Sequence, residues 1–123
     1  APQDLCIALE NVMEPSPEML VKIARQVDDP RLGLCLDVGH ANAEVSRVPP
    51  LEWLAPMAPW LRHLHLHNNR GAEDLHNPLG EGTVPMAQLL AAAQRLCPNA
   101  SFTLESQNCS ASLRWLREHG ELQ

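Results

Sequence analysis

The sequence has few aromatic residues and little positive charge. It contains three tryptophans and one phenylalanine but no tyrosine, so the aromatic stacking platforms of single-strand nucleic-acid binders are missing. Nine lysines and arginines stand against fifteen aspartates and glutamates, which gives a formal net charge of −6. Proteins that bind nucleic acid usually present a basic face to the phosphates. We therefore expect no nucleic-acid partner.

Long hydrophobic runs are also absent. No apolar stretch approaches the ~20 residues that a membrane-spanning helix needs, so we expect no membrane association. With 45% hydrophobic and 20% charged residues, the 123-residue chain has the composition of one globular domain. Residues 1–4 carry neither the basic segment nor the apolar core of a secretory signal, and we expect a cytoplasmic protein.

No cysteine pair has the CxxC spacing of many metal and redox motifs. Two of the four cysteines lie within apolar, strand-like runs, so we expect buried free thiols rather than disulfides. The four are Cys6, Cys35, Cys97 and Cys109. Because aromatic residues are scarce, we also expect the core to be built from aliphatic side chains.

Four apolar runs, each followed by a helical pattern, account for nearly the whole chain. Near-continuous apolar runs are typical of strands that are covered on both faces, as in a parallel sheet. We expect strands over residues 5–10, 32–38, 61–67 and 101–105. Apolar residues at helical spacing predict helices over residues 18–27, 51–57, 84–96 and 110–119. Ser16 and Ser110 are the expected N-caps of the first and last helices.

Each expected strand ends near a residue that can bind a metal. These residues lie about 30 to 40 positions apart, close to the length of one strand–helix–strand repeat. They are Glu10, Asp37, His65 and Glu105. In a (β/α)8 barrel, equivalent strand ends meet at the catalytic face. Three carboxylates and one imidazole favour Mn²⁺ or Mg²⁺, with Co²⁺ as a further candidate, over the thiolate-rich sets of structural zinc.

Five segments together resemble the xylose isomerase-like TIM-barrel superfamily, which includes sugar and sugar-phosphate isomerases and epimerases as well as endonuclease IV. They keep their order and spacing over essentially the whole chain. The segments are LENV at 9–12, LDVGHA at 36–41, HLHLHNN at 63–69, D-x-H with PLGEGTV at 74–84, and TLES at 103–106. The resemblance implies an α/β fold of the (β/α)8 type, in which residues 1–123 form the last four β–α units.

The resemblance also implies roles for individual residues. In ketose 3-epimerases of the superfamily, one divalent metal is bound by four residues at positions that look like Glu10, Asp37, His65 and Glu105. The two glutamates would stand on opposite faces of the substrate as the catalytic pair. His40 and Arg70 look like substrate-binding residues, with a one-residue gap before Arg70, and Asp74 and His76 are further candidates for that role.

The expected activity is therefore metal-dependent isomerisation or epimerisation of a small sugar, sugar phosphate or related hydroxy-carbonyl compound through an enediolate. Two alternatives remain open. Endonuclease IV carries extra zinc ligands at positions that look like His40, Asp74 and His76, which would suit a phosphodiester hydrolase. The chain could also be a catalytically incomplete barrel fragment.

Two further histidines alternate with leucines beside His65. Because His63 and His67 lie two residues from His65, their side chains should point to the same inner face of the barrel. We expect both to hydrogen-bond to neighbouring groups there rather than to bind metal directly. Relatives usually carry aspartate where this chain has Asn68. Four strands without the other four would leave two open sheet edges and an apolar face. We expect an N-terminal half barrel, or a second copy of this chain, to cover them.

Overall fold

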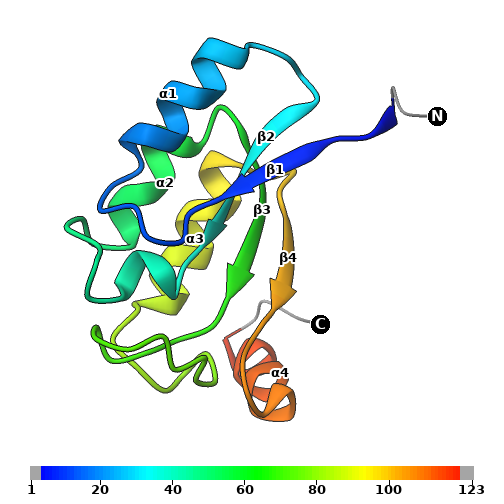
Figure 1. Cartoon of the computed structure of the whole chain (residues 1–123). Helices are drawn as coiled ribbons and strands as arrows, with labels where there is room; N and C mark the ends of the chain where they lie inside the picture. The colour runs from blue at the N-terminus through cyan, green and yellow to red at the C-terminus, as the bar shows by residue number, and fades with distance from the viewer. Residues whose placement is uncertain (1–3, 120–123) are drawn as a thin grey trace.

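Four parallel strands form one sheet in the order β1-β2-β3-β4 in the computed structural model, which describes residues 4–119 (Figure 1). The strands are β1 (Ile7–Glu10), β2 (Leu32–Asp37), β3 (Leu61–Leu66) and β4 (Ser101–Leu104). The helices are α1 (Glu18–Val27), α2 (Leu51–Met57), α3 (Met86–Leu96) and α4 (Cys109–Glu118), with a short 3-10 turn, η2 (His40–Asn42). The order of elements confirms the predicted α/β fold and half of a TIM barrel.

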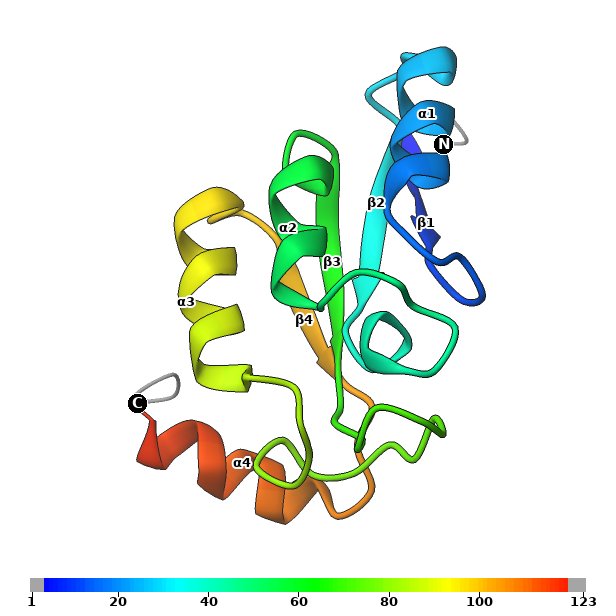
Figure 2. The same cartoon turned by 90° about the vertical axis from the view of Figure 1, so that its left-hand side faces the viewer.

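The helices are arranged unequally around the sheet. Figure 2 shows α1, α2 and α3 along one face, whereas α4 lies beyond the carboxyl end of β4. The core between the sheet and these helices is mostly aliphatic, with Leu34, Leu36 and Leu64 fully buried. Trp53 corrects the expectation of a purely aliphatic core: its ring is fully buried, and its indole N–H donates to the Val48 carbonyl at 3.0 Å.

The two outer strands are much more exposed than the two inner ones. Every residue of β2 after Leu32 is buried, whereas β1 and β4 contain no buried residue. At the edges, Ile7 is 65% exposed and Phe102 is 46% exposed. Strands of a closed barrel have a neighbour on both sides, so this pattern is that of half a barrel.

Local chemistry corrects several sequence-based expectations. Helix α4 begins after Asn108, which adopts φ 52° and accepts a hydrogen bond from the Ala111 N–H at 3.2 Å, so Ser110 is not its cap. Asparagine tolerates this left-handed conformation better than serine. Ser16 precedes the N-cap position and accepts from the Glu18 N–H at 3.4 Å.

The cysteines follow the expectation only in part. All four are free, but only Cys35 and Cys97 are buried, while Cys6 and Cys109 are exposed. Cys6 precedes β1 at the open edge of the sheet, and Cys109 begins α4. Among residues 4–119, no helix has the length and apolar character needed to cross a bilayer.

The long loop after β3 is organised around Asn68, which is 1% exposed. Its side-chain N–H₂ donates to the carbonyls of Leu79 at 2.8 Å and Val84 at 3.4 Å. Its side-chain oxygen accepts from the backbone N–H groups of Asn69 at 2.9 Å and Val84 at 3.0 Å. Gly82 allows this approach, because an added Cβ would lie 2.2 Å from that oxygen. An aspartate could not donate either bond, so asparagine suits this loop.

Asn68→Asp is expected to lower the free energy of unfolding by about 2–3 kcal/mol at pH 7. The buried carboxylate would face the carbonyl oxygens of Leu79 and Val84 but could donate no hydrogen bond to either. Urea denaturation measures the change. Asn77→Asp is the matched control: its side chain is only partly buried and donates one exposed bond, to the Glu81 carbonyl at 3.1 Å. Equal losses in the two variants would contradict the account.

Candidate metal centre

The four expected ligands converge at the carboxyl ends of the strands. Glu10 and Asp37 end β1 and β2, His65 lies in β3 opposite Asp37, and Glu105 directly follows β4. Parallel pairing in register therefore brings together residues that are far apart in the sequence. The His65 Nδ1 atom lies 3.1 Å from Glu10 Oε1, 3.4 Å from Glu105 Oε1 and 3.6 Å from Asp37 Oδ2.

This spacing suits atoms that share one cation. Ligands bonded at about 2.1 Å lie roughly 3 to 3.5 Å from one another. Asp37 is fully buried, and its Oδ1 atom accepts from the His40 N–H at 2.9 Å and from His67 Nε2 at 2.6 Å. Its Oδ2 atom, which faces His65, is buried without a hydrogen-bond partner among residues 4–119. Three carboxylates, one of them with an unpartnered buried oxygen, and one imidazole fit a hard divalent ion.

The surroundings of the ligands shift several pKa values. Burial raises the pKa of Glu10, and the nearby Asp37 carboxylate adds to this effect, against the opposing charge of His65. Burial also acts to raise the pKa of Asp37, but the hydrogen bonds and charges of His67 and His40 together outweigh it and lower that pKa. Burial and the carboxylates of Glu10, Asp37 and Glu105 raise the pKa of Cys35 to about 12, so that residue stays a thiol.

A second polar cluster adjoins the first. The Asp74 Oδ2 atom lies 3.1 Å from His40 Nε2 and 3.2 Å from His76 Nε2. The other ring nitrogens donate to backbone carbonyls, His40 Nδ1 to Asn11 and His76 Nδ1 to Glu105, both at 2.7 Å. Both nitrogens of His40 are thus engaged within the protein, so contact with a substrate hydroxyl would require its Nε2 to exchange Asp74 for the substrate.

The same contacts affect the pKa values of the two histidines. Burial acts to lower the pKa of His40, but the Asn11 carbonyl and the nearby carboxylates of Asp37, Asp74 and Glu10 outweigh burial and raise it. For His76, burial is likewise outweighed by the Glu105 carbonyl and by Asp74, and its pKa is raised. These contacts stabilise the imidazolium form of each ring, in which its Nε2 donates to Asp74.

The metal-free protein is expected to lose part of its stability as pH rises. Histidines whose pKa is raised by folding contribute stability below about pH 6.5, and this contribution disappears as pH rises through their folded pKa values. In EDTA, the Tm advantage of the wild type over Asp74→Asn should therefore be larger at pH 6 than at pH 9. Glu73→Gln, at an exposed loop position, serves as the control. An advantage that grows with pH would contradict this assignment.

The remaining candidates take different positions. Arg70 is exposed in the loop after β3, and no hydrogen bond or ion pair joins it to the four expected ligands within the described residues. His63 is satisfied by hydroxyl groups, with Nδ1 2.6 Å from Ser101 Oγ and Nε2 2.7 Å from Thr103 Oγ1. Both ring nitrogens of His63 are thus occupied by hydroxyl groups of β4.

One residue that the sequence did not single out is Asn11. It is 2% exposed and bridges the ends of β1 and β2: its amide oxygen accepts from the Asp37 N–H at 2.7 Å, and its N–H₂ donates to the Asp37 carbonyl at 3.1 Å. Its own carbonyl accepts from His40. The sequence feature that could have identified Asn11 is its position directly after Glu10 in the LENV segment.

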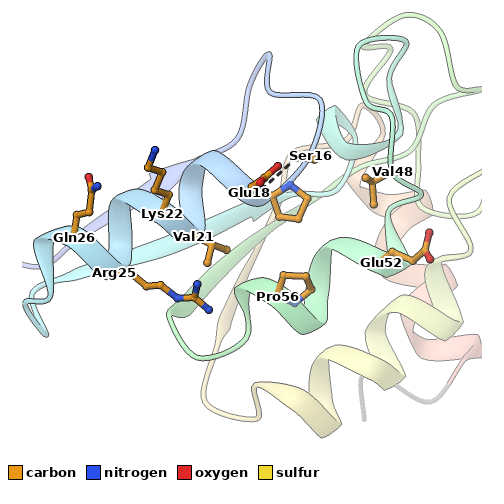
Figure 3. A pocket seen from close by; sticks show the side chains of 10 residues that line it. Ser16, Glu18, Val21, Lys22, Arg25, Gln26, Val48, Glu52 and Pro56 are labelled. Atoms are coloured by element: carbon orange, nitrogen blue, oxygen red, sulfur yellow. Dashed lines mark hydrogen bonds between the residues drawn. The ribbon is translucent and has the colours of Figure 1, made fainter.

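Two cavities lie on the surface near these elements. One of about 700 Å³ lies between α1 and α2, and its lining residues, drawn in Figure 3, include none of the candidate site residues. Another of about 520 Å³ adjoins the candidate site, since His40 and Asp74 line it together with Val12 and Met13 from the loop after β1. The second cavity thus borders the His40–Asp74 contact, and its lining includes none of the four expected metal ligands.

Known proteins match both the sequence and the fold. The family model described as "Xylose isomerase-like TIM barrel" matches residues 1–119. An uncharacterized protein of Methanocaldococcus jannaschii, MJ1311, is 30% identical over 108 residues, which cover 83% of this chain and 37% of that protein.

Two solved structures extend the comparison. A D-tagatose 3-epimerase-like protein matches with a TM-score of 0.78 and 26% identity over 94% of this chain and 47% of its own. The TTHB071 protein of Thermus thermophilus, soaked with ZnCl₂, matches with a TM-score of 0.72 and 32% identity over 94% of this chain and 45% of its own. The chain thus spans less than half the length of each of these three proteins.

Proposed function

Because the chain belongs to the xylose isomerase-like TIM-barrel family, we propose that it forms the metal-binding half of an isomerase or epimerase. The substrate class is a small hydroxy-carbonyl compound, such as a sugar or sugar phosphate. One observation carries the proposal: carboxylates from three other strand ends surround His65 Nδ1 within 3.6 Å. The resemblance to a D-tagatose 3-epimerase-like protein supports the reaction class.

Four residues would hold the metal, and two of them would also move a proton. Glu10, Asp37, His65 and Glu105 would hold Mn²⁺, Mg²⁺ or Co²⁺. When bound, the ion would supply positive charge that stabilises the negative charge developing on the substrate oxygens. Asp37 and His65 are the more enclosed pair, with side chains 0% and 20% exposed, and they serve the metal alone.

Glu10 and Glu105 are the proposed acid–base pair. Their side chains are 32% and 35% exposed, and they extend from the two outer strands of the sheet, so substrate could reach both. One glutamate takes the proton from the carbon next to the carbonyl, and the C–H electron pair forms the enediolate. Because the pKa of Glu10 is raised, it lies closer to neutral pH than that of an ordinary glutamate, which suits proton transfer.

The site to which the proton returns decides the product. Return to the same carbon from the opposite face gives an epimer, whereas return to the adjacent carbon on the same face interconverts aldose and ketose. The proposed role of His40, Asp74, His76 and Arg70 is to orient substrate hydroxyls, and His40 and Asp74 line the adjoining cavity.

Solvent deuterium exchange tests the proposal. With a ketose substrate and the barrel completed, we expect deuterium to enter the carbon next to the carbonyl only when a divalent metal is present. NMR of the recovered sugar identifies the labelled carbon and thereby separates epimerisation from isomerisation. Exchange that is unaffected by EDTA would contradict the proposed mechanism.

A phosphodiester hydrolase of the endonuclease IV type is the second candidate. One observation favours it: Asp74 and His76, two of the three expected extra ligands, form a group with His67 in place of His40, and the ligand atoms of this group all lie within 4.8 Å of one another. Zn²⁺ would then be the metal. The net charge of −6 opposes this function, because DNA would meet few cations on this half. Metal-dependent cleavage of an abasic-site duplex at low salt would establish it in place of the isomerase.

A further inference from the structure

His67 lies one residue beyond β3 and is fully buried. It continues the inward-facing series of His63 and His65, which carries it to the end of the barrel where the candidate ligands lie. Its Nε2 atom is 2.6 Å from Asp37 Oδ1. Its Nδ1 atom has no hydrogen-bond partner among the described residues and lies 3.7 Å from Asp74 Oδ1. Asp37 is thus the hydrogen-bond partner of the His67 ring.

The ring of His67 is held in place by its neighbours. His76 stacks on it with ring centroids 3.9 Å apart and an angle of 5° between the planes. Gly39 lies against its edge, where an added Cβ would come within 1.9 Å of Cε1. Position 39 has φ −68°, so glycine is needed there for space rather than for backbone conformation. A ring confined in this way can fix the direction of its hydrogen bond.

The contact with His67 settles which oxygen of Asp37 faces the other ligands. The Oδ1 atom accepts two hydrogen bonds, from His67 Nε2 and from the His40 N–H. The Oδ2 atom accepts none and faces His65 Nδ1 at 3.6 Å. Outer groups that orient metal ligands in this way commonly change metal affinity by roughly 10- to 100-fold.

We propose that His67 is a positioning residue, which orients the Asp37 carboxylate toward the metal without binding the metal itself. This inference rests on the proposed function, because it presupposes the metal centre. The inference gives the buried His67 side chain a role at the metal centre. It also explains why position 39 is glycine, since a side chain there would collide with the His67 ring.

Metal titration of variants tests this role. Calorimetric titration with MnCl₂ should show that His67→Leu binds Mn²⁺ roughly 10- to 100-fold more weakly than the wild type. His67→Gln can place an amide donor near the position of Nε2, so it should recover most of the lost affinity. His119→Leu is the control: His119 lies just after α4, where its ring hydrogen-bonds to the Trp115 carbonyl, and its loss should leave Mn²⁺ affinity unchanged.

Nitrogen-15 NMR of the metal-free wild type gives a second readout that needs no variant to fold. The imidazole proton of His67 should be found on Nε2, as donation to Asp37 requires. A bare Nε2 would overturn the inference. So would equal losses of affinity in His67→Leu and His67→Gln, which would identify a direct ligand. Unchanged affinity in His67→Leu overturns this inference alone, whereas a wild type that binds no divalent metal overturns the proposed function as well.

Discussion

Glu10→Gln and Glu105→Gln are each expected to lower turnover by roughly 10²- to 10⁴-fold, the range in which general acid–base catalysis contributes. Glutamine keeps the size of the side chain but cannot accept and return a proton. The two positions should differ in one respect: a variant that retains the proton-abstracting carboxylate can still exchange substrate hydrogen with solvent, although it forms no product. Turnover and deuterium incorporation are therefore measured together in the completed barrel.

Glu73→Gln provides the control for this pair, because Glu73 is an exposed carboxylate in the loop after β3. Its turnover should equal that of the wild type. Full turnover of a sugar by both Glu10→Gln and Glu105→Gln would exclude the two-carboxylate mechanism. Loss of exchange in both variants would mean that the metal is not retained without both glutamates, which the metal content of each variant would show.

The 123-residue chain on its own is expected to associate rather than to remain a monomer. Within residues 4–119, both outer strands have an unpaired edge, and Ile7 and Phe102 are exposed on these strands. Open edges pair readily with other strands, and a small domain with two of them buries little surface for its length. Light scattering should give a mass at least twice 13.6 kDa.

Substitutions at the edges test where this association occurs. Ile7→Ser combined with Phe102→Ser should shift the mass distribution toward the monomer. Met19→Ser is the control, because Met19 is 62% exposed on helix α1 rather than on an edge strand. Supplying the four missing β–α units should give one monodisperse species. A stable, monodisperse monomer of the 123-residue chain would contradict the half-barrel account.

The sequence predicts the order of elements well because each strand is a continuous apolar run and each helix a periodic one. The strand-end positions of Glu10, Asp37 and Glu105 follow from this, since parallel strands in register bring their carboxyl ends to one edge. Asn108 was missed because its left-handed conformation depends on the turn that precedes α4. Serine at position 110 is an equally good cap by residue type alone.

Contacts between loops are harder to predict than the strand ends. The bridge from Asn11 to the Asp37 backbone depends on how β1 and β2 lie side by side. The bond from His67 to Asp37 depends on the space left by Gly39. Alternation along β3 shows that His67 faces inward, but not which neighbour it contacts. These are tertiary contacts between residues about 26 to 30 positions apart, and no local pattern encodes them.

The most direct test of the metal centre compares the metal content of the wild type with that of Asp37→Asn after dialysis against MnCl₂ and removal of free ion. Asparagine has nearly the same shape but supplies no negative charge at the buried Oδ2 position. Asp29→Asn is the control, because Asp29 pairs with Arg31 at 2.8 Å before the start of β2, at the opposite end of that strand from Asp37. We predict that the wild type and Asp29→Asn retain Mn²⁺ and that Asp37→Asn loses it. Equal metal content in all three proteins would contradict the assignment of Asp37 and, with it, the proposed function.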